Sequence, residues 1–160
     1  MTKKQVKSYK ILVANGVNLD LLGVRQPEIY GTSSLKDLEA SLVLLQPQLE
    51  SLFQVSLQLV MFQSNHEGEF LETLSKTWDG ILLNPGAWTH TSLALADRLA
   101  AVGTPFVEVH ISNLATREDI RHISYSAPLA VGVSHGFGLE SYHTGLFGLL
   151  RYLKNKINLP

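Results

Sequence analysis

A carboxylate and an imidazole two residues apart are the pair most suited to chemistry in this chain. Glu108 and His110 lie on one face of a predicted strand, because side chains two residues apart in a strand share a face. The apolar run Phe106–Val109 is typical of a strand buried on both sides. A buried carboxylate needs a polar partner, and His110 or His90 is the nearest candidate.

Other polar side chains gather in four segments, each of which follows an apolar run. These segments are Asn15–Gly31, Gln63–Gly68, Asn84–Ser92 and His110–Asn113. The first has 17 residues, whereas a strand-to-helix connection usually has ~2–6 residues, and this length is typical of a binding loop or a lid. Considered alone, Thr89 and Asn113 are predicted to cap helices. His122, His135 and His143 have no supporting pattern and are predicted to be structural or exposed to solvent.

Several familiar sites have no support in the sequence. The chain has six histidines, but His66, His90 and His110 lie in different segments and no His-Glu-x-x-His spacing occurs, so we expect no metal site. No Lys-Ser/Thr follows Gly136–Gly138, the first loop lacks G-x-G-x-x-G, and no serine lies in a G-x-S-x-G turn. The absence of cysteine excludes thiolate nucleophiles and disulfides.

Length and composition predict one globular domain, residues 1–160. Hydrophobic residues make up 45% and charged residues 17%, and the net charge of −1 does not favour a nucleic-acid partner. The early apolar run Ile11–Ala14 ends at Asn15-Gly16 and is too short for a signal peptide. No stretch approaches the roughly 18 apolar residues of a membrane span. We expect a soluble, cytoplasmic protein with no membrane partner.

Short apolar runs alternate with helical patterns along the whole chain. Ser33-Ser34 is predicted to cap a helix that begins near Leu35, and Pro47 to disturb its last turn. The expected strands are Tyr9–Ala14, Phe53–Phe62, Ile81–Leu83, Phe106–Val109 and Leu129–Val133. The expected helices are Leu35 to about Leu49, Glu67–Trp78, Thr89–Val102 and Leu139–Lys156, with a short helical turn at Thr116–Arg121.

This alternation predicts an α/β fold, a flavodoxin-like doubly wound five-stranded parallel sheet with helices on both faces. Ligands of such sheets bind beyond the carboxyl ends of the strands, where the strand order reverses. The four polar segments all follow strands, so we expect them to meet at this edge. The connections that enter the strands should lack functional residues.

The polar segments together resemble the motifs of type II 3-dehydroquinate dehydratases. Asn15–Gly31 is similar to N-G-P-N-L-N-L-L-G-x-R-E-P-x-x-Y-G, and Q-S-N-H-E-G is intact at Gln63–Gly68. N-P-G-A-x-T-H-T-S is intact at Asn84–Ser92, as is V-E-V-H-I-S-N at Val107–Asn113. R-E-x-x-R-H-x-S follows at Arg117–Ser124. The departures are Val17, Asp20, Gln26 and, in a terminal G-x-G-x-x-G-Y pattern, Ser141. The resemblance covers residues 9 to 153.

The resemblance implies a lyase that converts 3-dehydroquinate to 3-dehydroshikimate by trans-dehydration through an enolate. It implies that Tyr30 removes the proton from C2 and that Arg25 lowers the pKa of Tyr30. Asn18 would stabilise the enolate, His90 would protonate the leaving hydroxyl, and Glu108 would support the acid–base network. No step requires a cofactor or a metal. A phenol has an ordinary pKa of about 10, so a nearby guanidinium is needed to make it a base, and a hydroxide leaving group needs an acid.

The resemblance also implies a set of substrate-binding residues and an assembly. Substrate hydroxyls would contact Asn84, His110 and Arg121, with His90 beside them. The carboxylate would be bound by the backbone of Ile111 and Ser112 and by the Ser112 hydroxyl. Asp97 would reach the site of a neighbouring subunit in a homo-oligomer, a dodecamer built as a tetramer of trimers.

Two other functions remain open at this point. One is a non-catalytic flavodoxin-like module, but a receiver domain needs acidic residues where this chain has Asn15-Gly16 and Asn84-Pro85. A flavin carrier would purify yellow. The other is a paralogue that keeps the assembly without turnover. Whether the pathway is biosynthetic (shikimate) or catabolic (quinate) is also open.

Overall fold

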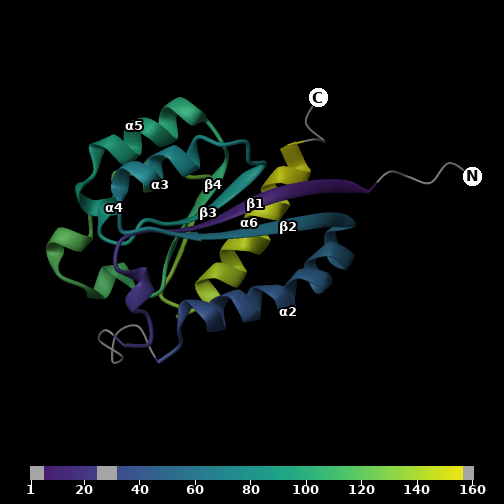
Figure 1. Ribbon diagram of the computed structural model, residues 1–160, viewed down its shortest axis with the longest axis horizontal. Coiled ribbons are helices and arrows are strands. Elements are labelled where there is room, and N and C mark those ends of the chain that lie inside the picture. Colours follow the sequence, from purple (N-terminus) through teal and green to yellow (C-terminus); the bar gives the residue numbers. More distant parts are fainter. Residues whose placement is uncertain (1–5, 25–31, 157–160) are drawn as a thin grey trace, which may run out of the picture.

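A five-stranded parallel sheet forms the centre of the molecule, as seen in a computed structural model that describes residues 6–24 and 32–156 (Figure 1). Its strands are β1 (Lys7–Asn15), β2 (Val55–Gln63), β3 (Gly80–Asn84), β4 (Phe106–His110) and β5 (Gly132–His135). Their order in the sheet is β2-β1-β3-β4-β5 and all four pairings are parallel. This is the flavodoxin-like order, and it reverses between β1 and β3. The predicted fold class is confirmed.

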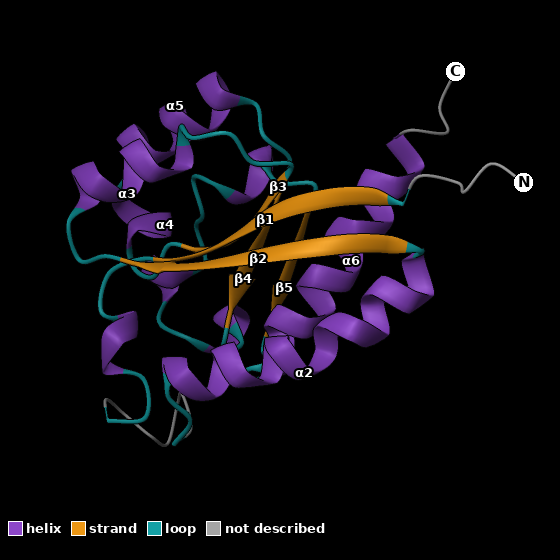
Figure 2. Cartoon of the chain, turned by 45° about the vertical axis from the view of Figure 1, so that its right-hand side comes forward, coloured by secondary structure: helices purple, strands orange, loops and turns teal. Residues whose placement is uncertain are grey.

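Helices cover both faces of the sheet (Figure 2). α2 (Leu35–Phe53) and α6 (Glu140–Lys156) lie on one face, and α3 (Glu67–Leu74), α4 (Trp88–Thr91) and α5 (Leu93–Val102) lie on the other. Ile11 and Val13 pack into the core under α2 and α6, whereas Leu12 and Ala14 pack into the core under α3 and α5. A strand buried on both faces needs an unbroken apolar sequence, and this explains the run in β1.

The first long helix departs from its prediction at its carboxyl end. Ser34 caps α2 with a reciprocal capping box, as expected. The predicted disturbance at Pro47 is wrong, because the helix continues through it to Phe53. Leu49 and Phe53 are buried after the proline, and this packing holds the last turn. Phe53 therefore ends a helix instead of starting a strand, and Gln54 leaves the helix in a left-handed conformation (φ 53°).

The predicted helix Thr89–Val102 is wrong as one helix, because Ser92 divides it. Ser92 has an extended backbone (φ −101°, ψ 103°), and its Oγ accepts a hydrogen bond from the Leu95 N–H at 2.9 Å. It is therefore the N-cap of α5, and α4 is a separate turn that carries Thr89 and His90.

Further boundaries differ from the sequence-based prediction, and the predicted turn Thr116–Arg121 is two separate 3₁₀ turns, η2 (Leu114–Thr116) and η3 (Asp119–Arg121). α3 ends at Leu74 instead of Trp78. The predicted strand Leu129–Val133 is displaced to Gly132–His135, because Ala127–Leu129, which contains Pro128, forms the 3₁₀ turn η4. The turn η1 (Leu19–Leu21) lies in the segment after β1, and η2 and η3 lie in the segment after β4.

Two glycines bring the segments after β1 and β3 into contact. The Gly16 N–H donates to the Asn84 carbonyl at 2.8 Å, and a Cβ on Gly16 would lie 2.4 Å from the Pro85 carbonyl oxygen. Gly86 has φ +63°, and its Cβ would meet the Val17 carbonyl oxygen at 2.6 Å. Only glycine fits such close backbone contacts. The polar residues of these two segments are thereby held beside each other.

Candidate active site

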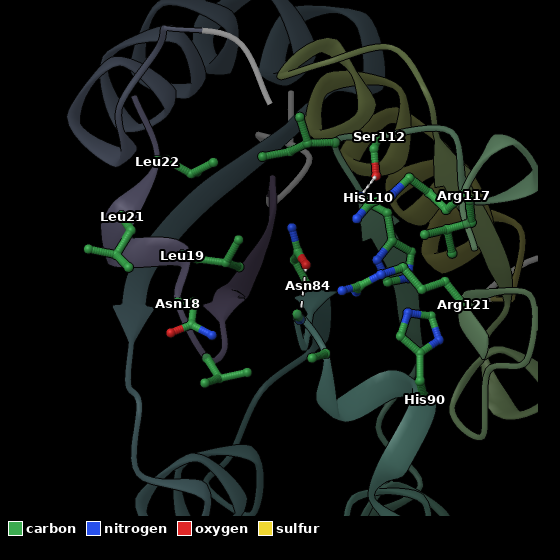
Figure 3. Close-up of a pocket in the computed structure, with 15 residues that line it drawn as sticks. Asn18, Leu19, Leu21, Leu22, Asn84, His90, His110, Ser112, Arg117 and Arg121 are labelled. Atoms are coloured by element: carbon green, nitrogen blue, oxygen red, sulfur yellow. Dashed lines mark hydrogen bonds between the residues drawn. The ribbon is translucent and has the colours of Figure 1, made fainter. Parts of the chain in front are cut away.

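An open cavity lies beyond the carboxyl ends of β1, β3 and β4 (Figure 3). It lies at the reversal of strand order, where the fold predicts a ligand. The segments after β1, β3 and β4 all line it, but the segment after β2 does not. One side is apolar, with Leu19, Leu21 and Leu22, and the other side carries His90, His110 and two arginines. No Asp or Glu is among the described residues that line it, so the cavity suits an anion with an apolar side.

Glu108 is the buried carboxylate at the base of this site. It is 0% exposed on β4 and accepts hydrogen bonds from four side chains. The donors are His110 Nε2 at 2.7 Å, Thr89 Oγ1 at 3.0 Å, Ser124 Oγ at 3.0 Å and Ser126 Oγ at 2.5 Å. Burial raises the pKa of Glu108, but His110 and the Ser126 and Ser124 hydroxyls more than offset it, and the net pKa lies below its ordinary value. The carboxylate is therefore charged at neutral pH.

The hydrogen bond to Glu108 fixes the protonation pattern of His110. An ionised carboxylate only accepts hydrogen bonds, so His110 Nε2 must carry a proton. His110 is one of the two partners that the sequence predicted for Glu108, and it is the one that makes the contact. Its ring stacks on that of His90, with centroids 6.3 Å apart and an interplanar angle of 18°.

His90 lies on α4 and lines the cavity, half-buried. Its Nδ1 lies 2.6 Å from the Ile123 carbonyl oxygen. A carbonyl can only accept, so Nδ1 is protonated and Nε2 is the nitrogen left for a ligand. Burial lowers the pKa of His90, and the charges of His110 and Arg121 lower it further, while the Ile123 carbonyl and Glu108 act in the opposite direction. An anion in the cavity would favour the protonated ring.

Two arginines face the cavity from the segment after β4 (Figure 3). The sequence predicts that Arg121 binds the ligand, and it predicts no role for Arg117. Glu118, which points to solvent, contacts the Nε atoms of Arg117 at 3.3 Å and Arg121 at 3.1 Å. Arg117 Nη1 donates to Ser112 Oγ at 3.3 Å. Since Ser112 Oγ accepts this bond, its own proton can be donated to an anion beside Ile111 and Ser112, both of which line the cavity.

Asn84 and Asn18 enter the cavity from β3 and from the segment after β1. The Asn84 side-chain oxygen accepts from the Gly86 N–H at 3.2 Å, shown by a dashed line in Figure 3. Asn18 adopts a left-handed conformation (φ 64°), and its N–H donates to Asn65 Oδ1 at 2.7 Å. Asn65 belongs to the segment after β2, which therefore positions a cavity residue without lining the cavity.

One predicted site residue, Asp97, lies apart from this cluster, and two others are not described. Asp97 is exposed on α5 and does not line the cavity. Tyr30 and Arg25 lie outside the described residues. Within residues 6–24 and 32–156, no group of three or more His, Asp or Glu side chains is placed to hold a metal ion.

Sequence reasoning missed several residues that complete the site. Thr89, considered alone, is predicted to cap a helix, but its hydroxyl instead contacts Glu108, Ser124 and Ser126. No local pattern shows this, since the partners come from segments up to 37 residues away. Arg117 could have been found, because it and Arg121 are four residues apart in one motif and both lie beside the carboxyl end of β4. Asn113 does cap η2 as predicted.

Comparison with known proteins places this geometry in a family. The chain matches the family model Dehydroquinase class II over residues 9–150. This chain belongs to the class II dehydroquinase family. Its relatives include the 3-dehydroquinate dehydratases of Synechococcus sp. (strain CC9605), 50% identical over 147 residues, and of Carboxydothermus hydrogenoformans, 46% identical over 152 residues. These alignments cover 90% and 93% of this chain and 97% and 95% of the relatives.

Solved structures of the class II dehydroquinase family support the same assignment. The crystal structure of the type II dehydroquinase from Butyrivibrio crossotus matches with a TM-score of 0.78 at 37% identity, covering 89% of this chain and 97% of that one. The predicted family is confirmed.

None of the helices in the described part of this dehydroquinase combines the length and the apolarity that are needed to cross a membrane.

One departure from the dehydroquinase motifs has a structural explanation. Ser141 replaces a glycine in the pattern that leads into α6. It is fully buried, and its Oγ accepts a hydrogen bond from the Phe137 N–H at 3.1 Å. The added hydroxyl therefore closes the turn before the helix. Nothing in the structure explains Asp20, which is exposed.

Proposed function

We propose that this class II dehydroquinase, a lyase, converts 3-dehydroquinate to 3-dehydroshikimate with Tyr30 as the base and His90 as the acid. The observation that carries the proposal is the charge of the cavity. Two guanidiniums and two imidazoles face it, and no acidic side chain among the described residues lines it. A small cyclic carboxylate with several hydroxyls fits such a site, because each oxygen can accept a hydrogen bond.

The substrate carboxylate binds beside Ile111 and Ser112. The Ser112 hydroxyl can donate to it, since Ser112 already accepts from Arg117. Arg121 and His110 bind hydroxyls on the ring, and Asn84 contributes an amide. The apolar side formed by Leu19 and Leu22 covers the carbon face of the ring.

The reaction begins with removal of the C2 proton by Tyr30, whose phenolate Arg25 stabilises. The carbonyl oxygen then gains negative charge, and Asn18 donates to this enolate, where a preorganised donor is most effective. Collapse of the enolate expels the C1 hydroxyl, which leaves as water after it takes the proton on His90 Nε2. His90 is held for this role by its bond to the Ile123 carbonyl.

Glu108 has no direct contact with the substrate in this proposal. It stabilises a positive charge on the histidine pair, since it is charged, buried and bonded to His110. The bound carboxylate also favours protonated His90. Substrate binding and protonation of His90 are thereby coupled.

We also propose a homo-oligomer, a dodecamer built as a tetramer of trimers, in the cytoplasm. Exposed apolar side chains near the cavity, Ile120 (72%) and Ile123 (60%), suit a subunit contact. Asp97, exposed on α5, would contribute to a neighbour's site. Sedimentation equilibrium tests the assembly, and a monomer would contradict it.

Turnover is tested by adding 3-dehydroquinate to the purified protein and recording the ultraviolet absorbance of the conjugated product. We expect absorbance to rise with the wild-type protein and not with His90→Ala. A flat trace from folded wild-type protein, or full activity in the variant, would contradict the proposal.

A further inference from the structure

Tyr142 is a fully buried residue of α6 whose hydroxyl lies between two side chains of the sheet edge. It donates to Asn15 Oδ1 at 2.6 Å and accepts from Asn84 Nδ2 at 2.7 Å. Asn15 and Asn84 are paired at the last position of the β1–β3 ladder, at the reversal of strand order. Tyr142 is thus linked to a residue that lines the cavity, although it does not line the cavity itself.

The hydrogen bonds around Asn84 determine which way its amide faces. The oxygen accepts from the Gly86 N–H at 3.2 Å, and a flipped amide would place two donors against each other there. One Nδ2 hydrogen is directed to Tyr142. Tyr142 can accept it, because its own proton is directed to Asn15. The chain of bonds therefore runs from Asn84 through Tyr142 to Asn15.

Removing the Tyr142 hydroxyl would leave this buried amide without one of its partners. Burial raises the pKa of Tyr142 far above its ordinary value, so the phenol remains neutral and keeps both its donor and its acceptor roles. Asn84 is 3% exposed, and an unpaired buried N–H is costly. Without Tyr142, the amide would turn to recover a partner and would lose its orientation toward the cavity.

We propose that Tyr142 is a positioning residue that makes Asn84 a hydrogen-bond donor to a substrate oxygen. The second Nδ2 hydrogen is the one presented to the ligand, so Asn84 selects for a hydroxyl or carbonyl oxygen at that point on the ring. This inference rests on the proposed function, because the ligand is taken to be 3-dehydroquinate. It assigns a positioning role to a helix residue that lies outside every segment lining the cavity.

The test is the steady-state kinetics of Tyr142→Phe with 3-dehydroquinate. Loss of one well-placed hydrogen bond to a bound substrate corresponds to about a tenfold change in affinity. We expect KM to rise about tenfold and kcat to change by less than about twofold, because a bond made equally in the ground and transition states affects KM. A merely structural residue would not give this division between KM and kcat.

Tyr9→Phe is a matched control. Tyr9 is also buried, at 3% exposed, and it lies in the first half of β1, but its hydroxyl has no hydrogen-bond partner among the described residues. Removal of this hydroxyl should leave both KM and kcat unchanged. Circular dichroism and thermal unfolding show whether each variant is folded.

A double-mutant cycle with Asn84→Ala tests whether Tyr142 acts through Asn84. If it does, adding Tyr142→Phe to Asn84→Ala should raise KM by less than about twofold, because the shared interaction is already lost. If Tyr142→Phe does not fold, Asn15→Ala takes its place, since it releases the Tyr142 proton from its acceptor. We expect that variant to raise KM severalfold.

Three results would overturn the inference. They are an unchanged KM in a folded Tyr142→Phe variant, an unchanged KM in Asn15→Ala, and a full tenfold effect in the Asn84→Ala background. In each case wild-type turnover shows that the proposed function stands. If wild-type protein does not turn over 3-dehydroquinate, both the function and the inference fail.

Discussion

Replacing Glu108 with Gln should destabilise the protein in a pH-dependent way. Four side chains donate hydrogen bonds to the Glu108 carboxylate, and the substitution removes its negative charge. It also places an N–H₂ donor where a carboxylate oxygen accepts one of these bonds. Glu108 is 0% exposed, so water cannot replace the lost bonds. Breaking a buried charged network of this kind costs about 3 kcal/mol. At ~2–4 °C per kcal/mol for a chain of this size, Tm at pH 7 should fall by about 6–12 °C.

The sign of the pH dependence follows from the lowered pKa of Glu108. A carboxyl whose pKa is lower in the folded state binds fewer protons there than in the unfolded chain. Its contribution to stability is present above the ordinary value of 4.5 and is lost as the pH falls through the folded-state pKa. The difference in Tm between wild type and Glu108→Gln should therefore be largest at pH 7 and should narrow below about pH 4.5.

Thermal unfolding followed by circular dichroism at pH 7, 5 and 3.5 measures both effects. Glu118→Gln is the control, since Glu118 also has a lowered pKa and bonds to two arginines but its side chain is 64% exposed. Its Tm should differ little from that of wild type. An unchanged Tm in Glu108→Gln at pH 7, or a difference that stays constant down to pH 3.5, would refute the reasoning.

Four other outcomes are expected. Tyr30→Phe should abolish turnover while a substrate mimic still binds by calorimetry; full activity would refute the base assignment. Arg25→Gln should lower kcat and move the pH–rate profile to higher pH, and an unmoved profile would argue against its effect on Tyr30. Ser92→Ala should lower Tm by about 2–4 °C through loss of the N-cap, and no change would mean that the cap contributes nothing. Dialysis against EDTA should leave activity unchanged; a loss restored by zinc would show a metal site.

Patterns that act along the chain were predictable from the sequence. The apolar run of β1 needs two covered faces, and the alternation of strands and helices gives the parallel sheet. Strand spacing placed Glu108 and His110 on one face and left His110 and His90 as candidate partners, and the structure shows the bond to His110. The family motifs then named Asn84, His90 and Arg121, and all three line one cavity.

Features that depend on tertiary contacts were not predictable in this way. Pro47 sits inside a continuous helix because Leu49 and Phe53 are held by the core, which outweighs its local preference. Thr89 on α4 had the local signature of a cap, yet it bonds to the Glu108 carboxylate on β4. Tyr142 is linked to Asn15 across 127 positions of sequence.

A crystal structure with a non-reactive mimic of 3-dehydroquinate tests the central claim most directly. We expect the mimic between His90 and Arg121, with its carboxylate at Ile111 and Ser112 and with Tyr30 next to the carbon that loses the proton. A mimic bound anywhere else, or one whose carboxylate faces Leu19 and Leu22, would contradict the account.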